Sequence, residues 1–505
     1  MLIIVIILGV IALILMADRS KDFLHILQLE GYDSEQYQKW LIANKSKLFS
    51  FKKNKQPLKK PLVFTDRAKR LFATNMALNA IIVIFFIFRA RNFLIPSPFW
   101  SFPMALIILV LLFSILYCAQ SFLIRGTNEI TKHWEERINM GYYLKAQEKI
   151  KNRQDLDVVG VTGSFGKTST KFILGTILEE KFKVLNTPES YNTPMGLSKV
   201  INNELTEEHQ VFIAELGARN IGDIKEVSEL VKPRIGVLTS IGPTHIETFK
   251  NIDNIMKTKY EMIEELPTDG IAIFNYDNEY IRKLADKTFK EKVLYGLEDV
   301  EKLDIYAENI QVSHSGSTFT IKDNEGYTMD CTTKLLGKHN IYNILAGVAV
   351  AKSLGLSYDE IKTGIEKIEP IPHRLNIIDP GTGITIIDDA FNSNPIGSKA
   401  ALEVLSQFKE GRKIIITPGM VELGAMEEEV NREFGRNIGK VCDYVILVGE
   451  NRTKPIYKGL MEANYNKDNI FVVNTLDEGT ATIQKLARPK DIILFENDLP
   501  DNYSE

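Results

Sequence analysis

The fold is decided by one stretch near the middle of the chain, DVVGVTGSFGKTST at residues 157–170. Its first five residues have the pattern of a buried β-strand, and the glycines that follow allow a tight turn into a helix. Such a turn brings backbone N–H groups and the positive end of a helix dipole to a phosphate. Lys167 can then neutralise β- and γ-phosphate charge, and the Thr168 hydroxyl can bind Mg²⁺. The stretch predicts an ATP-binding loop whose nucleotide-binding residues are Gly163, Ser164, Gly166, Lys167, Thr168 and Ser169.

The glycine spacing differs by one residue from the usual phosphate-binding loop. The general pattern expects glycine at Val161, whereas here it falls at Gly160. A glycine-rich turn with an incidental lysine is the alternative. The strand before the loop and the helix after it favour phosphate binding.

Short β-branched runs alternate with amphipathic stretches from about residue 157 onward, which is typical of βαβ units on a parallel sheet. Strands are predicted at 157–161, 211–214, 235–238, 271–274, 384–387, 413–416, 444–448 and 492–495. Pro370 and Pro372 indicate a connector at 368–374. We therefore expect two α/β domains, at 146–370 and 371–505.

Composition narrows the class of protein. The chain has 505 residues, 45% hydrophobic and 25% charged, which excludes a collagen-like, disulfide-rich or wholly disordered protein. The three cysteines, Cys118, Cys331 and Cys442, form no CxxC pair and suit a reducing compartment. Residues 18–70 hold thirteen Lys or Arg against six acids, and the net charge of −4 therefore leaves −11 on residues 71–505. This negative charge on residues 71–505 argues against nucleic acid as a partner.

Three hydrophobic runs, at 1–17, 71–88 and 104–124, precede the α/β pattern. The third has 21 uncharged residues, enough to cross about 30 Å of hydrocarbon. The first lacks the basic start and the cleavage site of a signal peptide, so we interpret it as a retained anchor. The second contains Asn75 and Asn79, for which a buried soluble hairpin is the alternative. We predict three transmembrane helices.

Charge predicts how those helices are oriented. The loop at 18–70 has thirteen basic residues, whereas the loop at 89–103 has two. Because the more basic loop usually stays in the cytoplasm, we expect an outside N-terminus and a multi-pass protein of the cell membrane with its catalytic domains in the cytoplasm. The basic loop also makes membrane lipids an expected partner.

Two polar residues follow predicted strands at the edge where open α/β sheets present ligands. Glu215 follows the strand at 211–214, and His245 lies beyond the strand at 235–238. Alone, Glu215 would more often be a solvated acid, and a lone histidine is usually structural. Beside a phosphate-binding loop, Glu215 is a candidate Mg²⁺ ligand, and His245 is distinguished by its position.

These motifs, in this order, resemble the Mur ligase family of ATP-dependent ligases in cell-wall peptide assembly, and most of all its D-alanyl-D-alanine-adding branch. The likeness runs from about residue 157 to 491. It rests on the loop at 160–169, YNTPMG at 191–196, TKYE at 258–261, GKHNIYN at 337–343, PHR at 372–374, DDAFNSNP at 388–395 and GMVELG at 419–424. The resemblance implies a central ATP-binding domain and a Rossmann-like C-terminal domain, and the family's own loop accounts for the shifted glycine.

The resemblance also implies metal ligands. Glu215 and His245 match the family's magnesium-binding positions, although its usual asparagine near Ser240 is absent. Lys259 matches a lysine that is carbamoylated to support a second metal ion. Thr168, Glu215, His245 and Lys259 would thus hold two Mg²⁺ ions. Physically, Lys259 reacts with CO₂ only if its pKa is depressed, and a solvated helix lysine is the alternative.

Further residues correspond to nucleotide and substrate contacts. Asn340 and Asn343 resemble the adenine-contacting pair, and three residues apart on a helix their amides would face one side; an N-capping asparagine with a polar neighbour is the alternative. Arg374 resembles the arginine that reaches the terminal phosphate, or it bridges the two domains. Asp389 would contact the ribose or the connector, with Asp388 a near-equal candidate. The 191–196 loop resembles the substrate-side loop, and from it we take Asn192 and Thr193 as substrate-binding residues.

The activity implied is amide synthesis in two steps. A substrate carboxylate attacks the γ-phosphorus of ATP to give an acyl phosphate and ADP, and an amine then displaces phosphate. The implied catalytic residues are Lys167, Glu215, His245, Lys259 and Arg374. Positioning and charge neutralisation are what phosphoryl transfer demands.

Two features depart from the family pattern. Residues 1–145 hold hydrophobic runs and a basic loop where a nucleotide-sugar-binding domain is expected, and DIILFENDLP at 491–500 replaces a basic segment. Both favour a membrane-held ligase that joins an amino acid or dipeptide to a lipid-linked or otherwise membrane-proximal envelope precursor, rather than a soluble enzyme that acts on a soluble UDP-linked one.

Three alternatives stay open. The chain could add glutamate to a poly-γ-glutamate or capsule polymer. An amidating relative with a glutaminase partner would need a four-cysteine zinc insertion, which three scattered cysteines do not supply. A nucleotide-binding membrane scaffold without turnover would not need the complete phosphoryl-transfer set found here.

Overall fold

The computed structural model describes residues 2–45, 61–94, 101–188, 191–244, 246–313, 316–390, 394–421 and 423–497. The described residues form two compact units, 2–140 and 141–497. The boundary between the units falls inside the long helix α6 (Gln120–Lys151).

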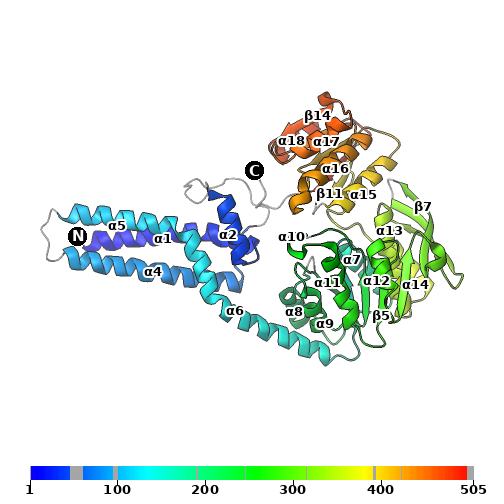
Figure 1. Ribbon diagram of the computed structural model, residues 1–505, viewed down its shortest axis with the longest axis horizontal. Helices are drawn as coiled ribbons and strands as arrows, with labels where there is room; N and C mark the ends of the chain where they lie inside the picture. Colours follow the sequence, from blue (N-terminus) through cyan, green and yellow to red (C-terminus); the bar gives the residue numbers. More distant parts are fainter. Residues whose placement is uncertain are drawn as a thin grey trace. The chain divides into compact units, whose positions relative to one another are not determined.

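The first unit is helical. Figure 1 shows α1 (Leu2–Leu29), α4 (Asp66–Leu94) and α5 (Ser101–Cys118) side by side, and α2 (Ser34–Ala43) packs near the end of α1. Their apolar side chains interlock through residues such as Val5, Met16, Val83, Leu109 and Phe113. Within the described residues, two helices are long and apolar enough to cross a membrane, Leu2–Leu29 and Asp66–Asn92, and α5 with α6 makes a third if a bent pair counts as one span.

Two predictions for this unit are wrong. The run at 104–124 is not one continuous helix, because α5 ends at Cys118 and α6 starts at Gln120 after a bend of 60°. The segment 18–70 is not all loop either, since α1 continues to Leu29, α2 follows and α4 begins at Asp66. Residues 46–60 of that segment lie outside the described residues.

A buried hydrogen-bond network of uncharged side chains lies where α5 meets α6. Gln120 Nε2 donates to Asn79 Oδ1 (2.8 Å), and Gln120 Oε1 accepts from Ser20 Oγ (2.8 Å) and Asn75 Nδ2 (3.2 Å). Thr127 Oγ1 adds a bond to Asn75 Oδ1 (3.3 Å). Because buried polar groups need partners, the network ties α1, α4 and α6 together at one level of the bundle.

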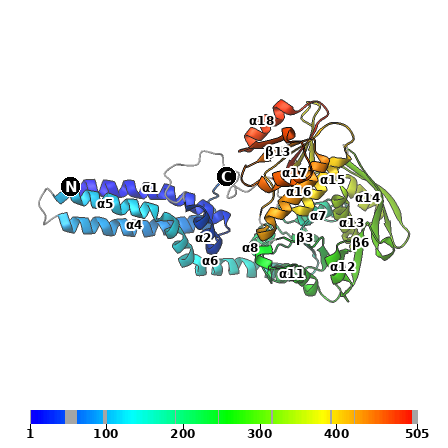
Figure 2. The same cartoon turned by 45° about the horizontal axis from the view of Figure 1, so that its top comes forward.

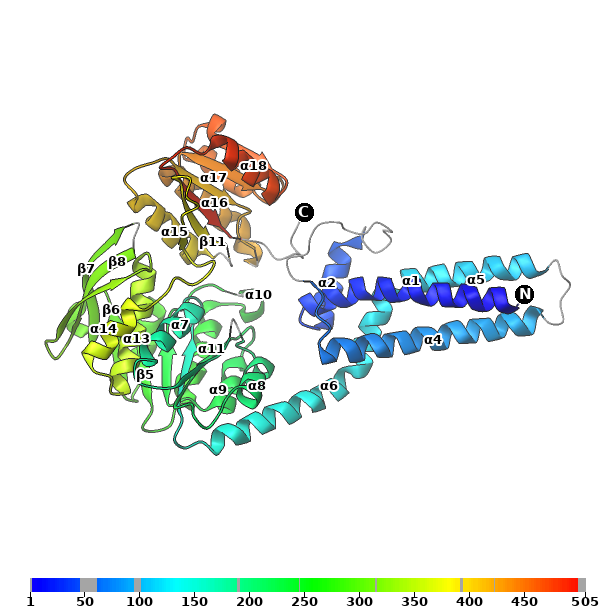
Figure 3. The same ribbon diagram turned by 180° about the vertical axis from the view of Figure 1, so that it is seen from behind.

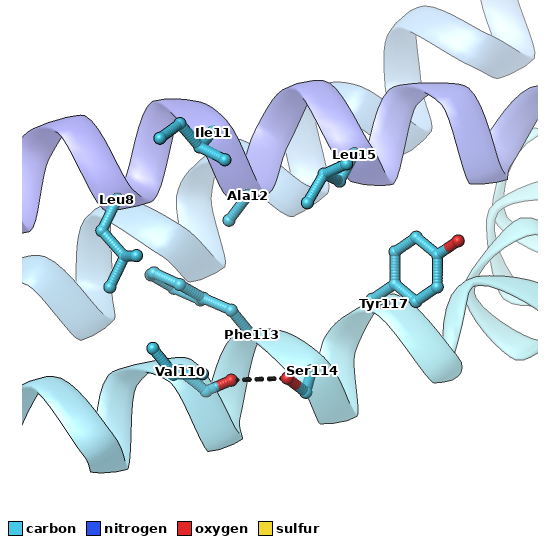
Figure 4. A pocket seen from close by; sticks show the side chains of 8 residues that line it. All are labelled: Leu8, Ile11, Ala12, Leu15, Val110, Phe113, Ser114 and Tyr117. Atoms are coloured by element: carbon cyan, nitrogen blue, oxygen red, sulfur yellow. Dashed lines mark hydrogen bonds between the residues drawn. The ribbon is translucent and has the colours of Figure 1, made fainter. Parts of the chain in front are cut away.

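Figure 4 shows a pocket of about 250 Å³ between α1 and α5. It is lined by Leu8, Ile11, Ala12 and Leu15 of α1 and by Val110, Phe113, Ser114 and Tyr117 of α5. The Ser114 hydroxyl donates to the Val110 carbonyl (2.7 Å), so its hydrogen atom is already used. The pocket suits hydrocarbon and has no group for phosphoryl or acyl chemistry.

The second unit contains a nine-stranded sheet. In spatial order its strands are β2 (Val184–Asn186), β3 (Val211–Glu215), β1 (Asp157–Thr162), β4 (Ile235–Leu238), β5 (Ile271–Asn275), β6 (Lys292–Gly296), β7 (Ile305–Ser313), β8 (Gly316–Asp323) and β9 (Thr328–Thr333). The pairs from β2 to β7 are parallel, and β7–β8 and β8–β9 are antiparallel. Because β3 and β4 flank β1, the strand order reverses there, which is where open α/β sheets bind ligands.

Helices cover both faces of this sheet. One face holds α7 (Lys167–Leu178), α13 (Lys338–Ser353) and α14 (Tyr358–Glu366). The other holds α8 (Pro194–Asn203), α9 (Asp223–Val231), α11 (Ile252–Glu265) and α12 (Glu279–Ala285). Figure 2 shows this layering, with α7 and α13 on one side and α11 and α12 on the other. Short helix α10 (Ile246–Phe249) follows β4.

A six-stranded sheet completes the second unit. Its order is β10 (Asn376–Ile378), β11 (Thr385–Asp389), β15 (Ile492–Glu496), β12 (Lys413–Thr417), β13 (Tyr444–Val448) and β14 (Ile470–Val473), with only β10–β11 antiparallel. One face carries α15 (Pro395–Gln407), α16 (Glu427–Val441) and α17 (Lys454–Glu462), and the opposite face carries α18 (Leu476–Leu486). Figure 3 shows these helices around the sheet.

All eight predicted strands overlap observed ones, and the α/β prediction is confirmed. The sequence reasoning missed β2, β6, β10, β14 and the antiparallel strands β7 to β9. Residues 367–375 between α14 and β10 form neither helix nor strand, as the proline-flanked connector predicts.

Candidate active site at the switch point

The phosphate-binding loop joins β1 to α7. Gly166, before α7, has a φ of 81°, a left-handed conformation that favours glycine. A Cβ on Gly163 would lie 2.2 Å from Thr239 Oγ1, so only glycine fits this approach. Ser164 N donates to Ser240 O (2.7 Å), which ties the loop to the end of β4. The path of the loop thus depends on its glycines and on the neighbouring strand.

Lys167 starts α7 and folds back over the loop. Its Nζ donates to Gly163 O (2.8 Å) and Ser164 O (3.4 Å). Burial lowers the pKa of Lys167, Glu215 opposes that shift, and Arg374 adds to it. A buried amine held only by carbonyl groups can exchange them for phosphate oxygens, which carry more negative charge.

Glu215 ends β3 and is 1% exposed. Its Oε2 accepts from Thr168 Oγ1 (3.0 Å) and lies 3.3 Å from Lys171 Nζ, while Oε1 accepts from Asn192 Nδ2 (3.0 Å). The structure therefore brings Thr168, Glu215 and Asn192, all predicted site residues, into one cluster. Ser169 follows Thr168 in the first turn of α7.

Lys171 is the site residue that sequence reasoning missed. Its side chain has no exposure, and it forms a buried ion pair with Glu215. A signal was present in the spacing, because Lys171 lies three residues before Leu174 and seven before Leu178, both fully buried on α7. A lysine on a core-facing stripe indicates a buried partner.

Lys259 lies on α11 and is 3% exposed, so it is not the solvated helix lysine of the alternative. Burial holds the pKa of Lys259 well below the usual value for lysine, and the charge of Lys167 lowers it further. Asp223, Glu261 and Glu215 act in the opposite direction without restoring it. A lowered pKa favours the neutral amine, which is the form that reacts with CO₂.

Asn340 and Asn343 lie on one side of α13, as their spacing predicts. Asn343 Nδ2 donates to Asn340 Oδ1 (3.3 Å), and Asn340 Nδ2 donates to Leu336 O (2.9 Å). Asn343 Oδ1 accepts from Thr170 Oγ1 on α7 (3.0 Å) and would lie 2.9 Å from a Cβ on Gly166. The capping alternative is wrong, because Gly337 occupies the N-cap of α13.

Arg374 lies in the connector between two residues with positive φ, His373 (60°) and Leu375 (48°). Burial lowers the pKa of Arg374, while the charges of Asp389 and then Glu215 raise it, so both carboxylates are electrostatic neighbours of the guanidinium. The two aspartate candidates have different surroundings. Asp388 Oδ2 lies 2.8 Å from His373 Nδ1.

Asp389 is the aspartate that faces Arg374. Its Oδ1 accepts from Leu375 N (3.2 Å). Burial raises the pKa of Asp389 to about 6, against the opposing effect of Arg374. The connector thus holds Arg374 within the electrostatic range of both Glu215, at the end of β3, and Asp389, at the end of β11.

Comparison with known proteins identifies the family of the chain that forms this site. Residues 161–351 match the Mur ligase middle domain, and residues 373–496 match the Mur ligase, glutamate ligase domain. The chain belongs to the Mur ligase family. The family resemblance drawn from its motifs is confirmed.

Curated relatives of this Mur ligase include UDP-N-acetylmuramoyl-tripeptide--D-alanyl-D-alanine ligases. That of Escherichia coli is 32% identical over 294 residues, which cover 58% of this chain and 64% of the relative. That of Haemophilus influenzae is 30% identical over 320 residues, covering 61% and 68% respectively. The matched part thus spans about two thirds of these relatives.

Solved structures similar to this chain also belong to the Mur ligase family. MurF from Acinetobacter baumannii superposes with a TM-score of 0.65 at 26% identity, over 71% of this chain and 77% of that one. MurF ligase from Thermotoga maritima, solved in complex with ADP, superposes with a TM-score of 0.64 at 26% identity, over 71% and 80%.

Two further predicted site residues of this Mur ligase, Thr193 and His245, are not seen in the cluster around Glu215. Thr193 Oγ1 accepts from Gly196 N (3.2 Å) and is the N-cap of α8, so its hydroxyl has a helix-capping role. His245 lies outside the described residues. Among the residues that are described, no three His, Cys, Asp or Glu side chains form a metal-binding group. Thr168 with Glu215 still suits Mg²⁺, which usually takes one or two carboxylates together with substrate phosphates.

His339, next to Asn340, makes the stability of this Mur ligase depend on pH. Burial, with the charge of Arg374, lowers the pKa of His339 to about 4. The unfolded chain binds this proton near pH 6.5, whereas the folded chain does so only near pH 4. The contribution of His339 to the free energy of unfolding is therefore fully present above pH 6.5 and is lost as the pH falls towards 4. Between pH 7 and pH 4, we expect the free energy of unfolding of His339→Gln to fall by about 2–3 kcal/mol less than that of the unsubstituted protein.

Urea unfolding of both proteins across that range measures the effect. The difference between the two proteins at each pH is the informative quantity, because Asp389 titrates in the same range with the opposite sign. Equal pH dependence in the two proteins would show that the pKa of His339 is the same in the folded and the unfolded chain.

Proposed function

We propose that this Mur ligase joins an amino acid or dipeptide to a peptidoglycan-type precursor at the membrane, using ATP, with D-alanyl-D-alanine as the first candidate donor. One observation carries the proposal: Lys167, Thr168 and Glu215 converge at the switch point of the sheet. The relatives named UDP-N-acetylmuramoyl-tripeptide--D-alanyl-D-alanine ligase support the choice of donor.

The residues supply charge and position for phosphoryl transfer. Lys167 and the loop N–H groups hold the phosphates, and Arg374 adds positive charge from the connector. The substrate carboxylate forms a bond to the γ-phosphorus while the bond to ADP breaks. The donor amine then attacks the acyl carbon, phosphate leaves, and the amine loses a proton. Asn192, bonded to Glu215, is proposed on the substrate side.

Mg²⁺ would supply further charge neutralisation of the phosphates. We propose Thr168, Glu215 and His245 as its ligands, with Lys259 supporting a second ion after carbamoylation. In that reaction the neutral Lys259 amine adds to CO₂ and releases a proton, which leaves a carboxylate. The lowered pKa of Lys259 supports this step. Asn340, Asn343 and Asp389 are proposed contacts of the nucleoside.

We further propose three functional parts, a membrane region at 1–145, an ATP-binding domain at 146–370 and a C-terminal domain at 371–505. The two helices α1 and α4, long and apolar enough to span, support membrane attachment. A membrane-held ligase has direct access to a lipid-linked precursor, so we propose that class of acceptor over a UDP-linked one.

Substrate turnover tests this proposal. We expect ADP release from the detergent-solubilised protein only when a muramoyl peptide and an amino donor are both present, and fastest with a lipid-linked peptide and D-alanyl-D-alanine. The panel pairs UDP-linked and lipid-linked peptides with D- and L-amino acids and the dipeptide. Efficient use of the UDP-linked peptide without gain from the lipid would contradict the acceptor class.

Other results of the panel separate the alternatives. ADP release that depends on glutamate and a polymer would identify a poly-γ-glutamate type of ligase. ATP binding without turnover on any pair would favour a scaffold.

A further inference from the structure

Apolar side chains are exposed along the first half of α6. Phe122, Ile130 and Trp134 are 59%, 71% and 71% exposed. They recur at intervals of four or eight residues, with Gly126 between the first two, and therefore follow one side of the helix. Exposed apolar groups aligned in this way indicate a contact surface.

The opposite side of α6 is occupied by the helical bundle. Ile124 packs in a cluster with Phe23, Leu24, Leu27, Tyr37, Leu41, Ala68 and Leu71. Asn128 Nδ2 donates to Tyr32 O (3.0 Å), and both carboxylate oxygens of Glu135 accept from Arg70 (2.7 Å each). These contacts fix the rotation of α6 about its own axis and turn Phe122, Ile130 and Trp134 away from the bundle.

The bend between α5 and α6 limits how far α6 rises from the membrane. The uncharged run ends at Ile124, and at about 1.5 Å per residue Trp134 lies roughly 15 Å farther along α6. Because of the 60° bend, the advance along the direction of α5 is half of that, about 7.5 Å. The headgroup layer beyond the hydrocarbon is about 5–7.5 Å thick on each side, so α6 reaches the outer edge of this layer near Trp134.

We propose that the first half of α6, residues 120–134, lies in the lipid headgroup layer of the membrane that α1, α4 and α5 span, with Phe122, Ile130 and Trp134 directed toward lipid. This inference rests on the proposed membrane attachment. Tryptophan prefers this layer because its ring is apolar and its N–H is polar. The charges of Lys132 and Arg137 on the same helix are balanced by those of Glu129 and Glu136, so the apolar side chains and the tryptophan ring are the groups that favour this layer.

Tryptophan quenching in lipid bilayers tests the inference. The full-length protein has three tryptophans, so Trp40→Phe and Trp100→Phe leave Trp134 as the reporter. It is placed in nanodiscs of phosphatidylcholine and phosphatidylglycerol that carry bromine either near the headgroup or deep in the acyl chain. We expect shallow bromine to quench Trp134 at least twofold more than deep bromine.

Two matched variants, made in a background that also carries Trp134→Phe, report a position inside the hydrocarbon and a position outside the membrane. Leu111→Trp on α5 should be quenched by deep bromine, and Glu148→Trp, in the second half of α6, should be quenched by neither. If Trp134 behaves like the reporter at position 148 while the one at 111 is quenched, the inference is overturned and membrane attachment stands. If the reporter at 111 is not quenched either, the inference about α6 and the proposed membrane attachment are both overturned.

Discussion

Replacing Lys167 with methionine is expected to lower ADP release at least about 10³-fold while leaving the fold intact. The side chain is half-buried beside the loop, where the lower dielectric strengthens the attraction of the amine to phosphate oxygens that gain charge during transfer. Methionine keeps the length of the side chain and removes the charge. The measurement is donor-dependent ADP release under saturating ATP, together with thermal unfolding of both proteins.

Lys181→Met is the matched control, because that lysine follows α7, is exposed, and donates to the Gly355 carbonyl. Its rate should stay within about twofold of the unsubstituted protein. A Lys167→Met variant that kept a tenth of the activity would remove Lys167 from the proposed mechanism.

The second large effect concerns the buried pair of Glu215 and Lys171. Glu215→Ala is expected to lower the free energy of unfolding by about 3–5 kcal/mol, because it removes the carboxylate 3.3 Å from a lysine with no exposure. Adding Lys171→Met should recover a large part of this loss, since methionine fills similar volume without a buried charge. Urea unfolding of the two single variants and the double variant in detergent gives the coupling energy.

The exposed pair Lys458 and Glu428, 3.1 Å apart, serves as the control, and its coupling should stay below about 1 kcal/mol. Additive effects at Glu215 and Lys171 would show that the pair is not a stabilising unit. Activity separates the two residues further. Glu215→Ala should be inactive, whereas Lys171→Met should retain turnover and require less Mg²⁺, because the competing cation beside Glu215 is gone.

Features that depend on residues close together in the chain could be predicted without the structure. The strand pattern, the glycines of the loop at 160–169 and the prolines of the connector act through local backbone chemistry, so the ATP-binding loop and the two α/β layers could be predicted. Glu215 could be predicted too, because a parallel sheet brings the ends of β1 and β3 to one edge. The spacing of Asn340 and Asn343 likewise predicted amides on one side of a helix.

Features that depend on which element packs against another could not be predicted in this way. The spacing of Lys171 indicates that it faces the core, but only the pairing of β3 with β1 places its partner, Glu215, beside it. Asn343 supports α7 because α13 crosses that helix on the same face of the sheet. The bend at Ala119 is likewise absent from an apolar run that would suit one straight span, and it occurs where Gln120 joins the polar network of α1 and α4. In each case a buried polar group is satisfied by a partner distant in sequence, which local periodicity cannot encode.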